Sequence, residues 1–147
     1  MSKFSFQTPV KHIPSFKEYK IDRVSLLIRI RDAGLYPFEM LDNWYYCTDD
    51  DGWIEIIPHL CLNSSLYKPE RRDCEWFGLK AMVNCHSDYG LNGFGLVIGN
   101  HPLGRHGWNI LVTPDDLWMF EPNDGFPESG QIFSIGGFGY DPERVLI

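Results

Sequence analysis

One cysteine lies where a charged loop changes into an apolar helical pattern. It is Cys74, in the stretch KPERRDCEWFGLKAM at residues 68–82. Asp73 is a common type of helix N-cap residue, so Cys74 is expected in the first helical turn. The unpaired N–H groups there favour an anion, and thiolate is the nucleophilic form of cysteine. Cys74 is therefore a candidate nucleophile. The alternative is a core cysteine that happens to lie at a helix start.

A nucleophilic thiol needs a base, and residues 104–124 (GRHGWNILVTPDDLWMFEPND) offer His106. The TPDD sequence favours a two-residue hairpin turn between two strands. In that register Asn123 lies opposite His106, and Glu121 is its diagonal neighbour on the same face. A histidine oriented by a carboxylate or amide beside a thiol is the arrangement of a catalytic triad. The alternative is a surface histidine beside a hairpin.

Helices are expected in the first half of the chain and around Cys74. Residues 15–35 have apolar positions at helical spacing and a glycine suited to end the helix, Gly34. A short helix is expected to begin at Asp49 or Asp50. A further helix is expected over residues 74–84. The expected buried positions are Ile21, Val24, Leu27 and Ile28 in the first helix and Phe77, Leu79, Met82 and Val83 in the last.

Short aromatic and aliphatic runs between glycines and prolines follow Asn84 and predict strands of one antiparallel sheet. The order of helices and strands predicts an α+β fold with N-terminal helices packed on one face of a C-terminal antiparallel sheet. We expect one domain over residues 1–147. Its parts are an extended arm (1–16), a helical part (17–64), and the nucleophile helix with the sheet (65–147).

Composition excludes several classes of protein. The 147 residues carry a net charge of −7, which argues against nucleic-acid binding. No apolar run approaches the ~20 residues of a membrane span, and the N-terminus does not resemble a signal peptide. The four cysteines show no common zinc spacing, so we expect reduced thiols in a cytoplasmic protein. No sequence feature indicates an oligomeric state.

The charge is unevenly distributed. Residues 1–33 carry seven basic and three acidic side chains, a net charge of +4, so the rest of the chain carries −11. This pattern is typical of a solvated basic helix face above an acidic body. The alternative is a docking surface for an acidic partner.

The stretches DCEWFG, YGLNGFGLVIGN, GRHGWNILV and LWMFEPNDG, within about residues 65–125, resemble one known family. It comprises the protease-like domain at the C-terminus of Marasmius oreades agglutinin and stand-alone bacterial and phage relatives. The resemblance implies a papain-like core. It implies Cys74 as nucleophile, His106 as base and Glu121 as orienting acid. It also implies that Asn92 and Asn109, with Asn123 in the signature after Glu121, support the site.

The resemblance implies a thiol protease or acyltransferase that acts on an amide bond of a protein or peptide substrate. Three features depart from the family pattern. The first glycine of a Gly-Asn-Gly strand is replaced by Leu91, Asn123 replaces a glutamine, and no oxyanion-hole glutamine lies in residues 63–73. These departures, together with many aromatic residues, support an alternative: a weakly active or inactive protein-binding module of the same fold. The lectin portion lies outside the resemblance, which therefore implies no sugar binding.

The resemblance also implies a dependence on calcium. Asp49, Asp50 and Asp51 provide oxygen ligands of the type that calcium takes, in the stretch TDDDGWIE. The stretch lacks the spacing of an EF-hand loop. The alternative is a helix N-cap with further solvated carboxylates, and no other cofactor is expected.

Overall fold

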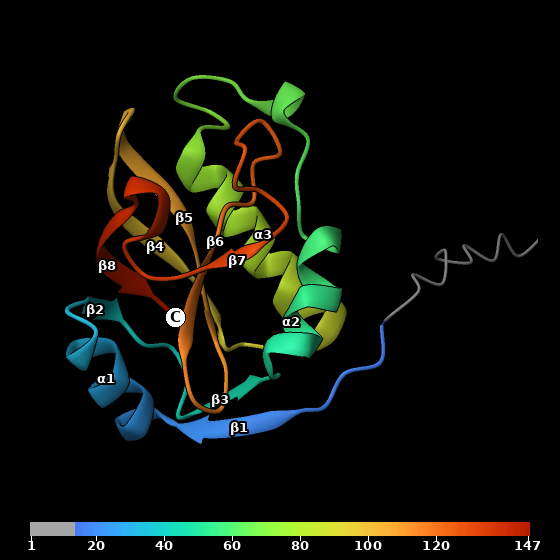
Figure 1. Cartoon of the computed structure of the whole chain (residues 1–147), viewed down its shortest axis with the longest axis vertical. Coiled ribbons are helices and arrows are strands. Elements are labelled where there is room, and N and C mark those ends of the chain that lie inside the picture. Colours follow the sequence, from blue (N-terminus) through green and yellow to red (C-terminus); the bar gives the residue numbers. More distant parts are fainter. Residues whose placement is uncertain (1–13) are drawn as a thin grey trace, which may run out of the picture.

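The computed structural model describes residues 14–147, which form a six-stranded sheet, a two-stranded sheet and three α-helices (Figure 1). Most of the expected arm, residues 1–13, lies outside the described residues. The strands are β1 (Tyr19–Asp22), β2 (Tyr36–Glu39), β3 (Trp44–Cys47), β4 (Phe94–His101), β5 (Gly104–Val112), β6 (Leu117–Phe120), β7 (Ile132–Phe133) and β8 (Asp141–Leu146). The α-helices are α1 (Arg23–Asp32), α2 (Asp50–Ile56) and α3 (Cys74–Tyr89), and the 3₁₀ helices are η1 (Ile57–His59), η2 (Ser64–Leu66) and η3 (Gly137–Gly139).

The large sheet has the strand order β2-β8-β4-β5-β6-β7. Strands β4, β5 and β6 are consecutive antiparallel neighbours, as the sequence predicted. In the β5–β6 ladder Asn109 pairs with Phe120 and Val112 with Leu117, which is the register expected from the TPDD turn. The Thr113 hydroxyl accepts hydrogen bonds from two turn N–H groups and stabilises this turn. The hairpin therefore brings the segment after β6 alongside His106.

Helix α3 lies across β4 and β5, and glycines permit the close approach (Figure 1). A Cβ at Gly107 would lie 3.1 Å from the Cα of Glu75, in the first turn of α3. The buried side chain of Asn109 donates to the carbonyl oxygens of Gly78 and Gly95, both at 2.9 Å. These contacts place the start of α3 beside the middle of β5.

Helix α3 begins at Cys74, as predicted, but it continues to Tyr89. It ends at Gly90, whose φ of 68° is a left-handed conformation that glycine adopts without strain. Of the expected buried positions, Phe77 and Met82 are buried. The others, Leu79 and Val83, are exposed.

The segment expected as one helix over residues 15–35 divides into a strand and a helix. Strand β1 pairs antiparallel with β3, and Asp22 then caps α1 by accepting from the Ser25 N–H. The buried face of α1 also differs from the prediction, because Leu26 and Ile30 are buried while Val24 and Ile28 are exposed. Apolar residues occur around much of this helix, so tertiary packing decides which of them are buried.

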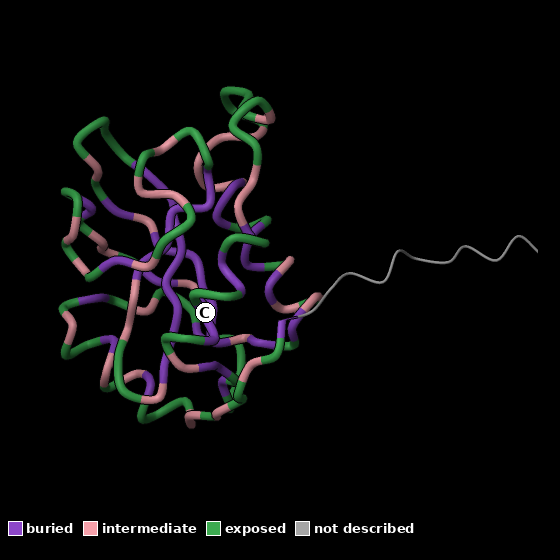
Figure 2. The backbone as a smooth tube through the Cα atoms, turned by 45° about the vertical axis from the view of Figure 1, so that its right-hand side comes forward, coloured by how far each residue is buried: buried purple, intermediate pink, exposed green. Residues whose placement is uncertain are grey.

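The predicted fold class is therefore wrong. The N-terminal part contributes three strands as well as helices, and β2 joins the large sheet as a parallel edge strand beside β8. Helix α1 contacts β1 and β2. Helix α2 packs on the large sheet through Trp53, whose indole donates to the Val112 carbonyl oxygen and whose ring lies 5.7 Å from that of Phe94. Buried backbone runs through the centre of the molecule and exposed backbone forms the outer loops (Figure 2). No helix within residues 14–147 is long and apolar enough to span a membrane.

Candidate functional site

A pocket of about 260 Å³ opens between the start of α3, the β4–β5 hairpin and the segment after β6. It contains three of the predicted site residues, Cys74, His106 and Asn123, and Glu121 lies directly behind it. The remaining lining residues are Tyr67, His101, Leu103, Gly104, Arg105 and Phe126. The structure thus brings together residues from four separate parts of the sequence.

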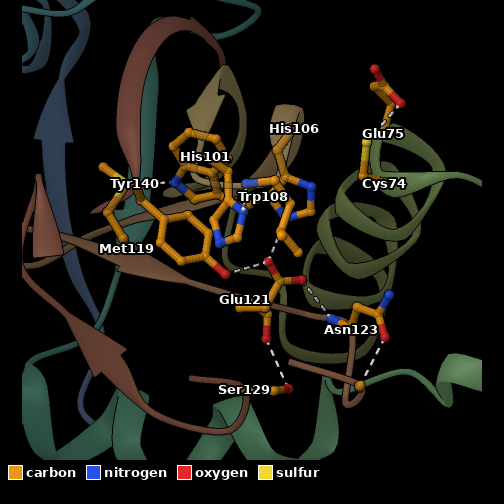
Figure 3. Close-up of polar contacts among 12 residues, drawn as sticks. Cys74, Glu75, His101, His106, Trp108, Met119, Glu121, Asn123, Ser129 and Tyr140 are labelled. Atoms are coloured by element: carbon orange, nitrogen blue, oxygen red, sulfur yellow. Dashed lines mark hydrogen bonds and ion pairs between the residues drawn. The ribbon is translucent and has the colours of Figure 1, made fainter. Parts of the chain in front are cut away.

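The predicted contact between His106 and Glu121 is confirmed (Figure 3). His106 Nε2 donates to Glu121 Oε2 at 2.7 Å, since a carboxylate has only acceptor sites. The same oxygen accepts from the Tyr140 hydroxyl at 2.9 Å, and Oε1 accepts from the Asn123 N–H at 2.9 Å. Glu121 is completely buried, so these donors replace the water that a carboxylate would otherwise bind.

Aromatic rings fix the plane of the His106 imidazole. Trp108 is stacked with it at a centroid distance of 5.8 Å, and Phe126 lies 4.9 Å away. The His101 ring is 5.2 Å from it, on the neighbouring strand β4. The wall of the pocket around His106 is therefore held by packing as well as by hydrogen bonds.

Cys74 lies in the first turn of α3 and is partly exposed, as predicted. Asp73 is the N-cap residue but makes no side-chain capping bond. The Cys74 thiol donates to Glu75 Oε2 at 3.1 Å (Figure 3). Burial raises the pKa of Cys74 to about 11, and the hydrogen bond to the Glu75 carboxylate adds to that effect. Burial and this carboxylate both favour the thiol over the thiolate.

The predicted supporting asparagines have separate positions. Asn123 lines the pocket, and its Oδ1 accepts from the Gly125 N–H at 2.9 Å. Asn109 joins α3 to the sheet, as described above. Asn92 lies away from the pocket, where Oδ1 accepts from the Tyr46 N–H at 2.6 Å and Nδ2 donates to the Trp44 carbonyl. Asn92 and Asn109 thus have structural hydrogen bonds.

The Asp49–Asp51 run begins α2. The Asp49 carboxylate accepts from the Gly52 N–H at 2.9 Å, and Asp50 accepts from the Trp118 indole at 3.0 Å. Within residues 14–147 no three His, Cys, Asp or Glu side chains form a group that could hold a metal ion. The observed contacts of Asp49 are those of a helix N-cap, which was the alternative interpretation. Calcium binding by this run stays a prediction, and the three carboxylates do not form a preformed set of ligands.

Two important residues of the site were missed from sequence. Tyr140 reaches Glu121 from a glycine-rich segment, and its contact spans 19 residues, so no local pattern signals it. His101 could have been found, because a hairpin between β4 and β5 necessarily brings the end of β4 close to His106. Burial and the Glu121 carboxylate raise the pKa of Tyr140, so its hydroxyl remains a donor to that carboxylate.

Comparison with known proteins gives a likeness at the level of fold. No protein-family model and no curated protein matches the chain. One similar solved structure is described as "PSL1a-E64 complex", with 19% identity, a TM-score of 0.63, and coverage of 87% of this chain and 51% of that chain. Another is Polyporus squamosus lectin bound to the epitope Neu5Aca2-6Galb1-4GlcNAc, with 17% identity, a TM-score of 0.64, and coverage of 87% and 49%. The chain thus spans about half the length of these structures.

These neighbours correct the functional predictions. The fold is shared with structures of a lectin, which overturns the predicted resemblance to a papain-like protease domain and the papain-like core. The favoured activity, a thiol hydrolase or acyltransferase with a catalytic triad, is contradicted, and so is a protein or peptide substrate.

Proposed function

We propose that this chain is a ligand-binding module and that the pocket beside His106 is its binding site. The observation that carries the proposal is the buried Glu121 carboxylate with its three donors, which fixes His106 before any ligand arrives. A site that is already ordered loses less conformational entropy on binding. The neutral Cys74 thiol, bonded to Glu75, fits a binding surface better than a nucleophile.

The lining of the pocket indicates the class of ligand. Tyr67 and Phe126 offer aromatic surface, while Arg105, Asn123 and His101 offer polar atoms. This combination suits a small molecule that has an apolar face and a polar edge. A sugar ring has both, because its C–H groups form one face and its hydroxyls lie around the rim.

We therefore infer a saccharide ligand. The likeness to a lectin bound to a sialylated trisaccharide supports this class. Because the chain spans only about half of that lectin, the pocket described here is an independent candidate for the sugar site.

Titration followed by NMR tests the proposal with the two molecules named for the similar structures, Neu5Aca2-6Galb1-4GlcNAc and E64. We expect saturable shifts at the amides of Cys74, His106 and Phe126. Tyr67→Ala should weaken binding by about tenfold through loss of the aromatic contact. The matched control is Tyr36→Ala, on the exposed edge strand β2, which should bind normally.

Reversible shifts with E64 alone, with no change in the mass of the chain, would support a binding module and reject the saccharide class. Two results would reject the proposed function: no shift at the pocket with either molecule, or equal affinities for Tyr67→Ala and the native chain.

A further inference from the structure

The tip of the β4–β5 hairpin, residues 101–104, forms one side of the pocket mouth. His101 pairs with Gly104 across the turn, and Gly104 has a φ of 121°, a conformation that favours glycine. Leu103, at the centre of the tip, is 84% exposed although it is a large apolar residue. It also lines the pocket. An apolar side chain in this position is available to contact a bound ligand.

One side-chain hydrogen bond holds this tip. The Leu103 N–H donates to His101 Nδ1 at 3.1 Å. The acceptor must be an unprotonated ring nitrogen, so His101 is in its neutral form with its proton on Nε2. Protonation would place a hydrogen on Nδ1 and abolish this bond, because an imidazolium has two donors and no acceptor.

The surroundings of His101 favour that neutral form. Its ring lies 4.6 Å from Tyr140, 5.4 Å from Phe126 and 5.2 Å from His106. Burial, followed by the charge of His106, lowers the pKa of His101 from its ordinary value of 6.5.

Three other titratable groups face His101. Glu121 and Glu128 favour the imidazolium, but their influence is smaller than that of burial and His106. The Tyr140 hydroxyl stays protonated, since its own pKa is raised. His101 thus stays neutral to a lower pH than an ordinary histidine.

We propose that His101 is a positioning residue for the binding site: its neutral imidazole holds Leu103 at the pocket mouth, and its protonation releases the tip and weakens ligand binding. This inference rests on the proposed function for its last step, while the hold on Leu103 can be measured without a ligand. It makes the hairpin tip a pH-dependent part of the site.

Two substitutions distinguish the role of the His101 acceptor nitrogen from that of its aromatic ring. His101→Asn offers an oxygen acceptor near the position of Nδ1 but does not titrate. His101→Phe keeps an aromatic ring against Tyr140 and Phe126 but has no acceptor. His59→Asn, at an exposed histidine that does not line the pocket, is the matched control.

The experiment records the protection factor of the Leu103 amide against hydrogen exchange, with the His101 ring nitrogen shifts, at about pH 7.5 and about pH 5. In the native chain and in His59→Asn, protection should fall about tenfold at low pH, as expected for loss of one hydrogen bond. His101→Asn should stay protected at both values, and His101→Phe should be unprotected at both. Amide spectra at each pH check that every variant remains folded.

The same samples are titrated with the two molecules used above. Affinity should fall severalfold at low pH in the native chain and stay constant in His101→Asn. Two results would show that His101 does not hold Leu103: a protection factor of the Leu103 amide that does not change as His101 titrates, or equal protection factors in His101→Phe and the native chain. Constant affinity despite loss of protection overturns its role in binding. Normal loss of protection with no binding at either pH supports the hold and rejects the proposed function.

Discussion

Glu121 Oε2 lies 2.7 Å from His106 Nε2, and the carboxylate is completely buried. The hydroxyl of Tyr140 and the backbone of Asn123 complete its hydrogen bonds. A buried charge without hydrogen-bond partners destabilises the folded state, because it has lost its hydration and gained nothing in return. This group of residues joins β5, the segment after β6 and the segment before β8, so it ties the pocket to the core.

Replacing Glu121 by glutamine should destabilise the protein by about 3 kcal/mol. Glutamine carries an NH₂ group in place of one carboxylate oxygen and has no negative charge. The hydrogen bonds that His106 and Tyr140 donate to this side chain would therefore be lost or weakened. Urea unfolding measures the loss. Glu55→Gln, at an exposed carboxylate in α2, is the control and should change the free energy of unfolding by less than about 0.5 kcal/mol. A loss no larger than that of the control would show that this network does not stabilise the fold.

Tyr140→Phe should cost about 2 kcal/mol near neutral pH, since it removes a donor to a buried carboxylate. The pKa of Tyr140 is raised in the folded protein, whereas a tyrosine in the unfolded chain titrates near 10. The hydroxyl's contribution is therefore present below pH ~10 and is lost as the pH rises above it. Denaturant midpoints measured across this range should fall more steeply for the native chain than for Tyr140→Phe. Parallel curves would contradict the raised pKa.

Asn109→Ala should destabilise the protein by about 3 kcal/mol, because it leaves the carbonyl oxygens of Gly78 and Gly95 without this donor inside the core. Asn43→Ala, at an exposed asparagine, is the matched control and should be nearly neutral. Thermal and urea unfolding give the difference. Equal stabilities would mean that contacts between α3 and the sheet do not depend on this amide.

Glu75→Gln should lower the pKa of Cys74 below its native value of about 11, since it removes an acceptor and a negative charge beside the thiol. The thiolate absorbance of a variant in which the other three cysteines are serine measures this titration. Asp51→Asn, at an exposed carboxylate that does not line the pocket, is the control and should leave the curve unchanged. An unchanged titration in Glu75→Gln would show that burial alone sets the pKa.

The β5–β6 hairpin and the start of α3 could be predicted because their signals are local. A two-residue turn and the period of two in strands set the register, and this placed Glu121 beside His106. Asp73 before an apolar pattern gave the first residue of α3. In both cases residues near in sequence determine the structure, so long-range packing has little effect on the outcome.

Other parts depend on contacts that sequence alone does not reveal. Strands β1 and β3 are only four residues each and pair across a helix, and β8 contains a proline and three charged residues. Tyr140 reaches Glu121 only because the chain returns across the sheet. The state of Cys74 depends on burial and on where the Glu75 side chain points. Motif order also indicated an activity that the comparisons contradict, and order of motifs alone does not establish a function, because one fold can carry different functions.

The rate at which native Cys74 reacts with iodoacetamide at neutral pH tests the central claim, that this site binds rather than attacks its ligand. The rate for each cysteine is measured from the fraction of its peptide that has gained the mass of the label at each time. With a pKa of about 11, Cys74 should react at least about tenfold more slowly than cysteine in an unfolded peptide, and no faster than the partly buried Cys61. Reaction of Cys74 about 100-fold faster than Cys61, abolished by His106→Ala, would contradict the binding account.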